Sequence, residues 1–145
     1  MKAKIKKQWY GKEKNLEELH SDASNWMSEL DFIRDEIRFL DRLMGLNYVQ
    51  FIDIGLDKTV KRIVKNLSQE KQALEKMYPL IHNHNNVLVE LINAKSTETD
   101  TNYLDTHLKL AKLINMYSEK YKGIKKEIFS IVEDTAKKKG IKKLN

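Results

Sequence analysis

The sequence predicts an all-α protein, and three observations support this prediction. The 145 residues include one proline and five glycines, so few positions would interrupt a helix. Three long segments carry apolar residues at alternating steps of three and four, which is the spacing of helices packed in coiled-coil fashion. With 41% apolar and 33% charged residues, the chain is long enough to bury a core of its own. We therefore expect an elongated, antiparallel, up-down-up three-helix bundle, formed by one domain over residues 15–139.

The first helix is predicted to begin at Leu16 and to end near Gly45. Its apolar seam stays in register throughout and contains Leu16, Leu19, Ala23, Trp26, Leu30, Ile33, Ile37, Leu40 and Met44. Phe32, Phe39 and Leu43 widen this seam, as expected for a helix that contacts two neighbours.

The second helix is predicted to begin at Asp57, which has the character of an N-cap. Its seam contains Val60, Ile63, Leu67, Glu70, Leu74, Met77, Ile81, His84, Leu88 and Leu91. An interior proline costs about 3 kcal/mol and kinks or ends a helix, but this seam passes Pro79 without a change of phase. We predict one long kinked helix with Pro79 on the face opposite the seam. A break at Pro79 would instead produce a four-helix bundle.

The third helix follows a polar stretch in which Thr97 and Asp100 have the spacing of a capping box. Gly140 is predicted to end this helix. Its seam contains Tyr103, His107, Leu110, Ile114, Tyr117, Tyr121, Ile124, Ile128, Ile131 and Thr135. The three tyrosines are interpreted as core aromatics whose hydroxyl groups reach the edge of the bundle.

Few charged residues lie close to the seams. Glu70 is expected at the level of Lys125, where an ion pair would set the register of the helices. Asp35 and Glu36 are expected on a solvated face. A catalytic carboxylate would need a second acid beside it, and the seams supply none.

The connection over residues 46–56 is unusually apolar for a loop. One interpretation is a plug that covers the open end of the bundle. The other is a docking patch for a protein partner or a second copy, formed by Tyr48, Val49, Phe51 and Ile52, because exposed contiguous apolar surface marks interfaces.

The formal net charge of +6 is concentrated at the two ends of the chain. Residues 1–14 form a basic N-terminal arm with a net charge of +5, residues 136–145 also carry +5, and the remainder carries −4. Residues 140–145 are interpreted as a basic tail, and the lysines before them suit the end of a helix dipole. The alternative is binding of nucleic acid or an acidic surface through Lys4, Lys6, Lys7, Trp9, Tyr10, Lys138 and Lys139, where an aromatic ring stacks on a base.

Several function classes are excluded by what the sequence lacks. Without cysteine there is no thiolate catalysis, disulfide scaffold or cysteine-ligated zinc. Neither glycine-rich motif for a nucleotide phosphate occurs. No apolar run matches a membrane span or a signal peptide, so we expect a soluble, cytoplasmic protein.

Histidines offer the only candidate chemistry. Folding the predicted helices back on one another brings His20, His84 and His107 to similar levels, and Glu17 lies three residues before His20. A di-iron carboxylate bundle needs two Glu-x-x-His steps and two further glutamates, and only one step is present. Three imidazoles and a water would suit zinc or another divalent metal. The other interpretation is structural histidines and no cofactor.

The first predicted helix also carries a recognisable pattern. It contains Leu19-His20-Ser21-Asp22, Trp26-Met27-Ser28-Glu29-Leu30, Phe32 and Asp35-Glu36-Ile37. This pattern resembles a group of small uncharacterised bacterial helical proteins whose first helix reads LHSExxxWLSELxFxxDEI. Weaker similarity to that group's DHxxLR and LRKEF stretches occurs at residues 107–108 and 125–128. The resemblance implies three helices without an assigned activity, and it marks His20, Trp26 and His107. The group's Asp before the histidine is Thr106 here, which removes a carboxylate partner for His107.

These observations lead to three functional hypotheses. The first is a non-enzymatic helical interaction module that works through a protein partner or homo-oligomer. The second is a divalent-metal-binding bundle that uses His20, His84 and His107. The third is a nucleic-acid or acidic-surface binder that uses the lysine-rich ends.

Overall fold

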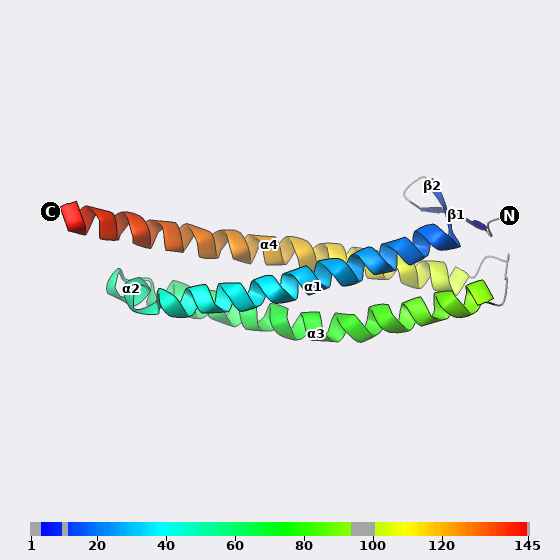
Figure 1. The fold of residues 1–145 in the computed structure, drawn as a ribbon, viewed down its shortest axis with the longest axis horizontal. Helices are drawn as coiled ribbons and strands as arrows, with labels where there is room; N and C mark the ends of the chain where they lie inside the picture. Colours follow the sequence, from blue (N-terminus) through cyan, green and yellow to red (C-terminus); the bar gives the residue numbers. More distant parts are fainter. Residues whose placement is uncertain (1–3, 10–11, 94–100, 145) are drawn as a thin grey trace. The chain divides into compact units, whose positions relative to one another are not determined.

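The computed structural model describes residues 4–9, 12–93 and 101–144, and its side chains over residues 16–93 and 102–138. The elements in chain order are β1 (Lys4–Trp9), β2 (Lys12–Asn15), α1 (Leu16–Leu46), α2 (Tyr48–Asp53), α3 (Asp57–Asn93) and α4 (Thr101–Leu144) (Figure 1). The predicted helical class is confirmed, because four helices hold nearly all of the described residues. The predicted capping box at Thr97 and Asp100 lies outside the described residues.

The basic arm predicted for residues 1–14 is largely a β-hairpin. β1 and β2 pair in antiparallel fashion, with Lys4 opposite Asn15 and Trp9 opposite Lys12. Tyr10 lies outside the described residues. This arm was interpreted through its lysine charges and its aromatic residues, and no strands were predicted, although two residues between short alternating segments also suit a hairpin connection.

The chain divides into two compact units, and each contains parts of α1, α3 and α4. The first unit comprises residues 1–32 and 74–116, and the second comprises residues 33–73 and 117–145. Within the first unit, His20 of α1 bonds to Asn85 of α3, and Asp31 bonds to Tyr78. Since the partner's number falls as the α1 number rises, these parts of α1 and α3 are antiparallel. In the second unit, Arg62 of α3 bonds to Glu127 of α4.

The predicted seams are the core of each unit. Every seam residue of the three long helices is buried except Trp26 and Leu91, which are half-buried. Phe32 and Phe39 were expected to widen the core, and this expectation is wrong because both are exposed. The charged faces leave no described helix long and apolar enough to cross a bilayer.

α3 contains Pro79 in its interior, and Figure 1 draws α3 as one continuous helix. The Pro79 side chain is exposed, as predicted for the face opposite the seam. Solvent can hydrate the carbonyl that the proline ring leaves without an amide partner, so the helix tolerates it. The alternative four-helix bundle with a break at Pro79 is therefore wrong, and the additional helix is the short α2.

α1 ends at Leu46, as predicted near Gly45, whereas α4 continues past Gly140, its predicted end, to Leu144. A glycine inside a helix costs about 1 kcal/mol relative to alanine, which the flanking helix-forming residues offset. The predicted basic tail is thus helical over residues 140–144.

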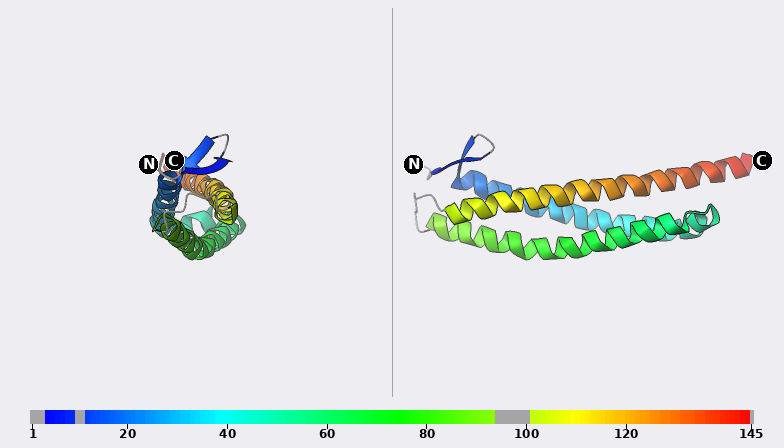
Figure 2. Two further views of the ribbon diagram at one scale, coloured as in Figure 1. Left: turned by 90° about the vertical axis from the view of Figure 1, so that its right-hand side faces the viewer. Right: turned by 180° about the vertical axis from the view of Figure 1, so that it is seen from behind.

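α2 forms a compact turn between α1 and α3 (Figure 2). The Asn47 side chain donates to the Leu43 carbonyl at 2.9 Å, which closes the end of α1. Gly55 has a positive φ of 79° and its amide donates to the Ile52 carbonyl at 3.0 Å. Only glycine adopts this conformation at little cost. α3 then begins at Asp57, as predicted.

Candidate functional site

A chain of hydrogen bonds joins two buried histidines to a carboxylate in the first unit. Nε2 of His84 on α3 lies 2.8 Å from Nδ1 of His107 on α4. Nε2 of His107 lies 3.0 Å from Oδ2 of Asp22 on α1. Asp22, His84 and His107 come from α1, α3 and α4, so all three long helices contribute to this set. We call these three residues the His–His–Asp relay.

The positions of the protons in the relay follow from which atoms can donate and which can accept a hydrogen bond. An ionised Asp22 can only accept, so Nε2 of His107 donates to it. Nδ1 of a neutral His107 then accepts, and Nε2 of His84 supplies the proton. A neutral His84 is left with an unprotonated Nδ1, which is a hydrogen-bond acceptor.

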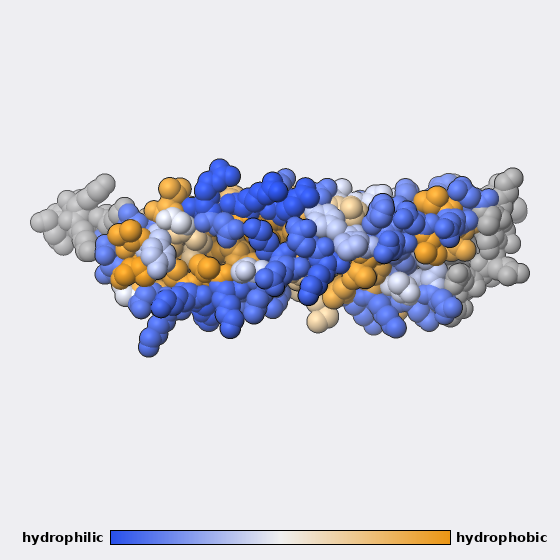
Figure 3. All heavy atoms as spheres, turned by 90° about the horizontal axis from the view of Figure 1, so that it is seen from below, coloured by the Kyte–Doolittle hydropathy of each residue, from blue (hydrophilic) through white to orange (hydrophobic). Residues whose placement is uncertain are grey.

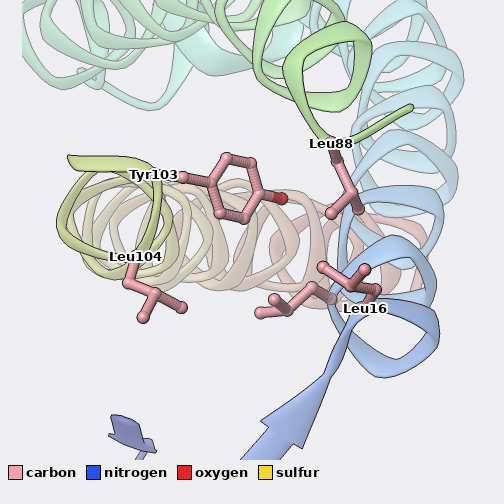
Figure 4. Close-up of a cluster of buried hydrophobic side chains, with 5 residues drawn as sticks. Leu16, Leu88, Tyr103 and Leu104 are labelled. Atoms are coloured by element: carbon pink, nitrogen blue, oxygen red, sulfur yellow. The ribbon is translucent and has the colours of Figure 1, made fainter. Parts of the chain in front are cut away.

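Aromatic rings enclose the two histidines. The His84 and Tyr103 rings stack with centroids 4.2 Å apart and an interplanar angle of 4°. Trp26 of α1 lies 4.6 Å from the His107 ring, measured between centroids. His107 is 0% exposed and His84 is 5% exposed. Figure 4 shows Tyr103 beside Leu88 and Leu16, within a cluster that also includes Leu19 and Leu104.

Burial changes the proton affinities in this cluster. Loss of solvation, together with the neighbouring His107, lowers the pKa of His84 to about 4. Burial also raises the pKa of the Tyr103 hydroxyl, to which the negative charge of Asp22 contributes. At neutral pH, His84 is therefore an uncharged acceptor and Tyr103 keeps its proton.

The predicted three-histidine set is not assembled. His20 is exposed and its Nδ1 lies 3.0 Å from Oδ1 of Asn85, while Glu17 is exposed on the same helix. His20 flanks the α1 seam, and its hydrogen bond is to Asn85 of α3 and not to His84 or His107. Across the described residues, no three His, Cys, Asp or Glu side chains are arranged to hold a metal ion.

Asp22 was missed by the sequence interpretation. A carboxylate partner for His107 was sought one residue before it in α4, at Thr106. The structure supplies this carboxylate from α1 instead, where Asp22 lies one helical turn before Trp26. The i, i+4 spacing of Asp22 and Trp26 was the available signal, because both then face the same neighbour.

A second set of polar contacts lies in the second unit and corrects two expectations. Oε1 of Glu70 lies 3.3 Å from Nζ of Lys120, so the predicted pair with Lys125 is wrong. Lys125 instead donates to Glu36 at 2.9 Å. Glu36 is half-buried rather than solvated, and the Tyr121 hydroxyl also donates to it. Burial raises the pKa of Glu70, and Lys120 partly offsets this rise.

The surface candidates divide by exposure. Tyr48, Val49 and Ile52 are exposed on α2, whereas Phe51 is 0% exposed and packs inward. The lysine-rich candidates Lys4, Lys6, Lys7 and Trp9 lie on β1, and the structure describes only their backbone. Lys138 is exposed on α4, and the structure describes only the backbone of Lys139.

Comparisons with protein-family models, curated proteins and solved structures found no match.

Proposed function

We propose that this chain is a non-enzymatic helical interaction module that self-associates through the surface formed by α2 and the end of α1. One observation carries this proposal. Leu46 and Val49 are 75% and 65% exposed, and Tyr48 and Ile52 are exposed beside them in sequence. These four residues define the α2 patch. Exposed apolar residues gathered on one short segment mark an interface.

The α2 patch is also held in a fixed conformation. Phe51 is buried beneath it, and the amides of Phe51 and Leu56 donate to the carbonyls of Asn47 and Phe51, each at 2.9 Å. A preorganised surface loses little conformational entropy when it binds. The apolar plug and the docking patch were alternatives in the sequence. Burial of Phe51 supports the plug, and exposure of its neighbours supports the patch.

Charge does not oppose a second copy of this chain as the occupant. Residues 41–58 contain Arg42 and Lys58 against Asp41, Asp53 and Asp57, a net charge of −1 in a chain of +6. Two such surfaces repel each other weakly, and the two signs allow self-complementary pairing about a two-fold axis. Figure 3 shows apolar surface at the end of this face where Figure 1 places α2.

The finer architecture belongs to the same proposal. An antiparallel three-helix bundle with coiled-coil-like packing is supported by contacts of α1, α3 and α4 with one another inside each unit. Membership of the bacterial helical group and a cytoplasmic location are proposed with it, and the first rests on the residue pattern of α1.

Light scattering over a range of protein concentrations tests self-association. The wild-type chain is expected to show a concentration-dependent mass above the 17.1 kDa of one copy. Val49→Asp places a charge in the patch and is expected to give a monomer. Met116→Asp is the matched control, because Met116 is equally exposed but lies on α4 in the first unit. A wild-type chain that stays monomeric at every concentration would contradict the proposal.

One other candidate has a separate test. Nucleic-acid or acidic-surface binding through the lysine-rich ends requires retention that falls steeply with salt and is lost when residues 1–14 are deleted.

A further inference from the structure

A pocket of about 370 Å³ opens beside the His–His–Asp relay, between α3 and α4 of the first unit. Besides His84, it is lined by Leu80, Asn83, Val87, Asn102, Tyr103 and Thr106. Its volume is within the range of small-molecule sites, which are mostly apolar with a few polar groups that fix orientation. None of these lining residues carries a formal charge at neutral pH, so the pocket favours an uncharged ligand.

Two of the exposed apolar side chains of the protein line this pocket. Leu80 and Val87 lie seven residues apart on α3 and are both among the exposed large apolar residues. His84 lies between them on the same helix face, and the Tyr103 ring covers one side of the His84 ring. The surface of the pocket is thus mostly apolar, and its polar lining residues are His84, Tyr103, Thr106 and two asparagines.

The hydrogen bonds of the relay determine which ring nitrogen of His84 carries a proton and which is an acceptor. Asp22 fixes the proton of His107 on Nε2, and His107 in turn fixes the proton of His84 on Nε2. Nδ1 is the remaining polar atom of the His84 ring, and no described residue makes a hydrogen bond to it. Nδ1 of His84 is not among the buried side-chain atoms of the described residues, so a ligand hydroxyl can replace water as its hydrogen-bond donor.

We infer that the pocket binds a small uncharged molecule with an apolar body and one hydroxyl group, and that this hydroxyl donates to Nδ1 of His84. The apolar body lies against Leu80 and Val87. This site is independent of the α2 patch, which belongs to the second unit, so either can fail without the other.

Two probes of similar size test the inference. 4-Fluorophenol carries the hydroxyl donor, whereas 4-fluoroanisole replaces it with a methoxy group that can only accept. Fluorine NMR titration is expected to show 4-fluorophenol binding about tenfold more tightly, which corresponds to one hydrogen bond. Nitrogen NMR of labelled imidazoles is expected to show an unprotonated His84 Nδ1 whose resonance moves when 4-fluorophenol is added.

Two variants locate the site. Val87→Trp fills the pocket from an exposed position and is expected to abolish probe binding while the imidazole spectrum of the free protein is retained. His82→Phe is the control, because His82 is exposed and lines a different pocket. Equal affinity for the two probes, a protonated Nδ1, unchanged binding by Val87→Trp or no binding of 4-fluorophenol would each overturn the inference.

Discussion

Acidification should destabilise the protein through His84. The pKa of His84 is about 4 in the folded chain and near 6.5 when unfolded, so the unfolded chain binds more protons between these values. The contribution of neutral His84 to the free energy of unfolding is therefore fully present above about pH 6.5, and it is lost as the pH falls toward 4. Linkage gives a loss of about 2 kcal/mol near pH 5, and water at the open side of the pocket reduces it to about 1 kcal/mol.

Urea denaturation followed by circular dichroism at a series of pH values measures this loss. His84→Gln removes the titrating ring but keeps an amide that can donate to His107, so this variant should lose about 1 to 2 kcal/mol less than wild type near pH 5. His82→Gln, on the exposed face of the same helix, should follow the wild-type curve. The groups that face His84 are His107 and Tyr103 of α4, and Asp22 lies beyond His107. Identical pH profiles for His84→Gln and wild type would refute the reasoning.

Three further single variants and one double variant test the packing, with urea denaturation near neutral pH as the measurement. Pro79→Ala should raise the free energy of unfolding by about 1 to 3 kcal/mol, because it restores an interior helix hydrogen bond at an exposed position; a loss would show that Pro79 has packing contacts. Lys120→Met should lower it by about 1 to 2 kcal/mol by leaving the buried Glu70 carboxylate without its cation. Glu70→Gln added to Lys120→Met should recover most of the lost free energy of unfolding. If nothing is recovered, packing of the Lys120 aliphatic chain, and not its charge, is responsible for the stabilisation. Leu67→Ala should cost about 2 to 5 kcal/mol through a core cavity, and a cost below about 1 kcal/mol would contradict its central place in the seam.

The long helices and their buried faces were predictable because helical periodicity is local. A residue's angle around the helix axis depends only on its position in the repeat. For this reason the seam identified the core from Leu16 to Thr135, and its unbroken phase showed that α3 continues through Pro79. The pairing of β1 with β2 was not predicted, because these strands are short and their lysines obscure any alternation.

The axial register between neighbouring helices was determined only by the tertiary structure. The repeat says nothing about sliding along the axis, and five residues of error correspond to about 7 Å. Glu70 accordingly pairs with Lys120 instead of Lys125, and Lys125 pairs with Glu36. The meeting of His84 and His107 was predictable because both lie on seams and at similar distances from their connecting loop. The Asp22 carboxylate came from a third helix, whose axial position no local pattern encodes, and it is this contact that sets the protons of both rings.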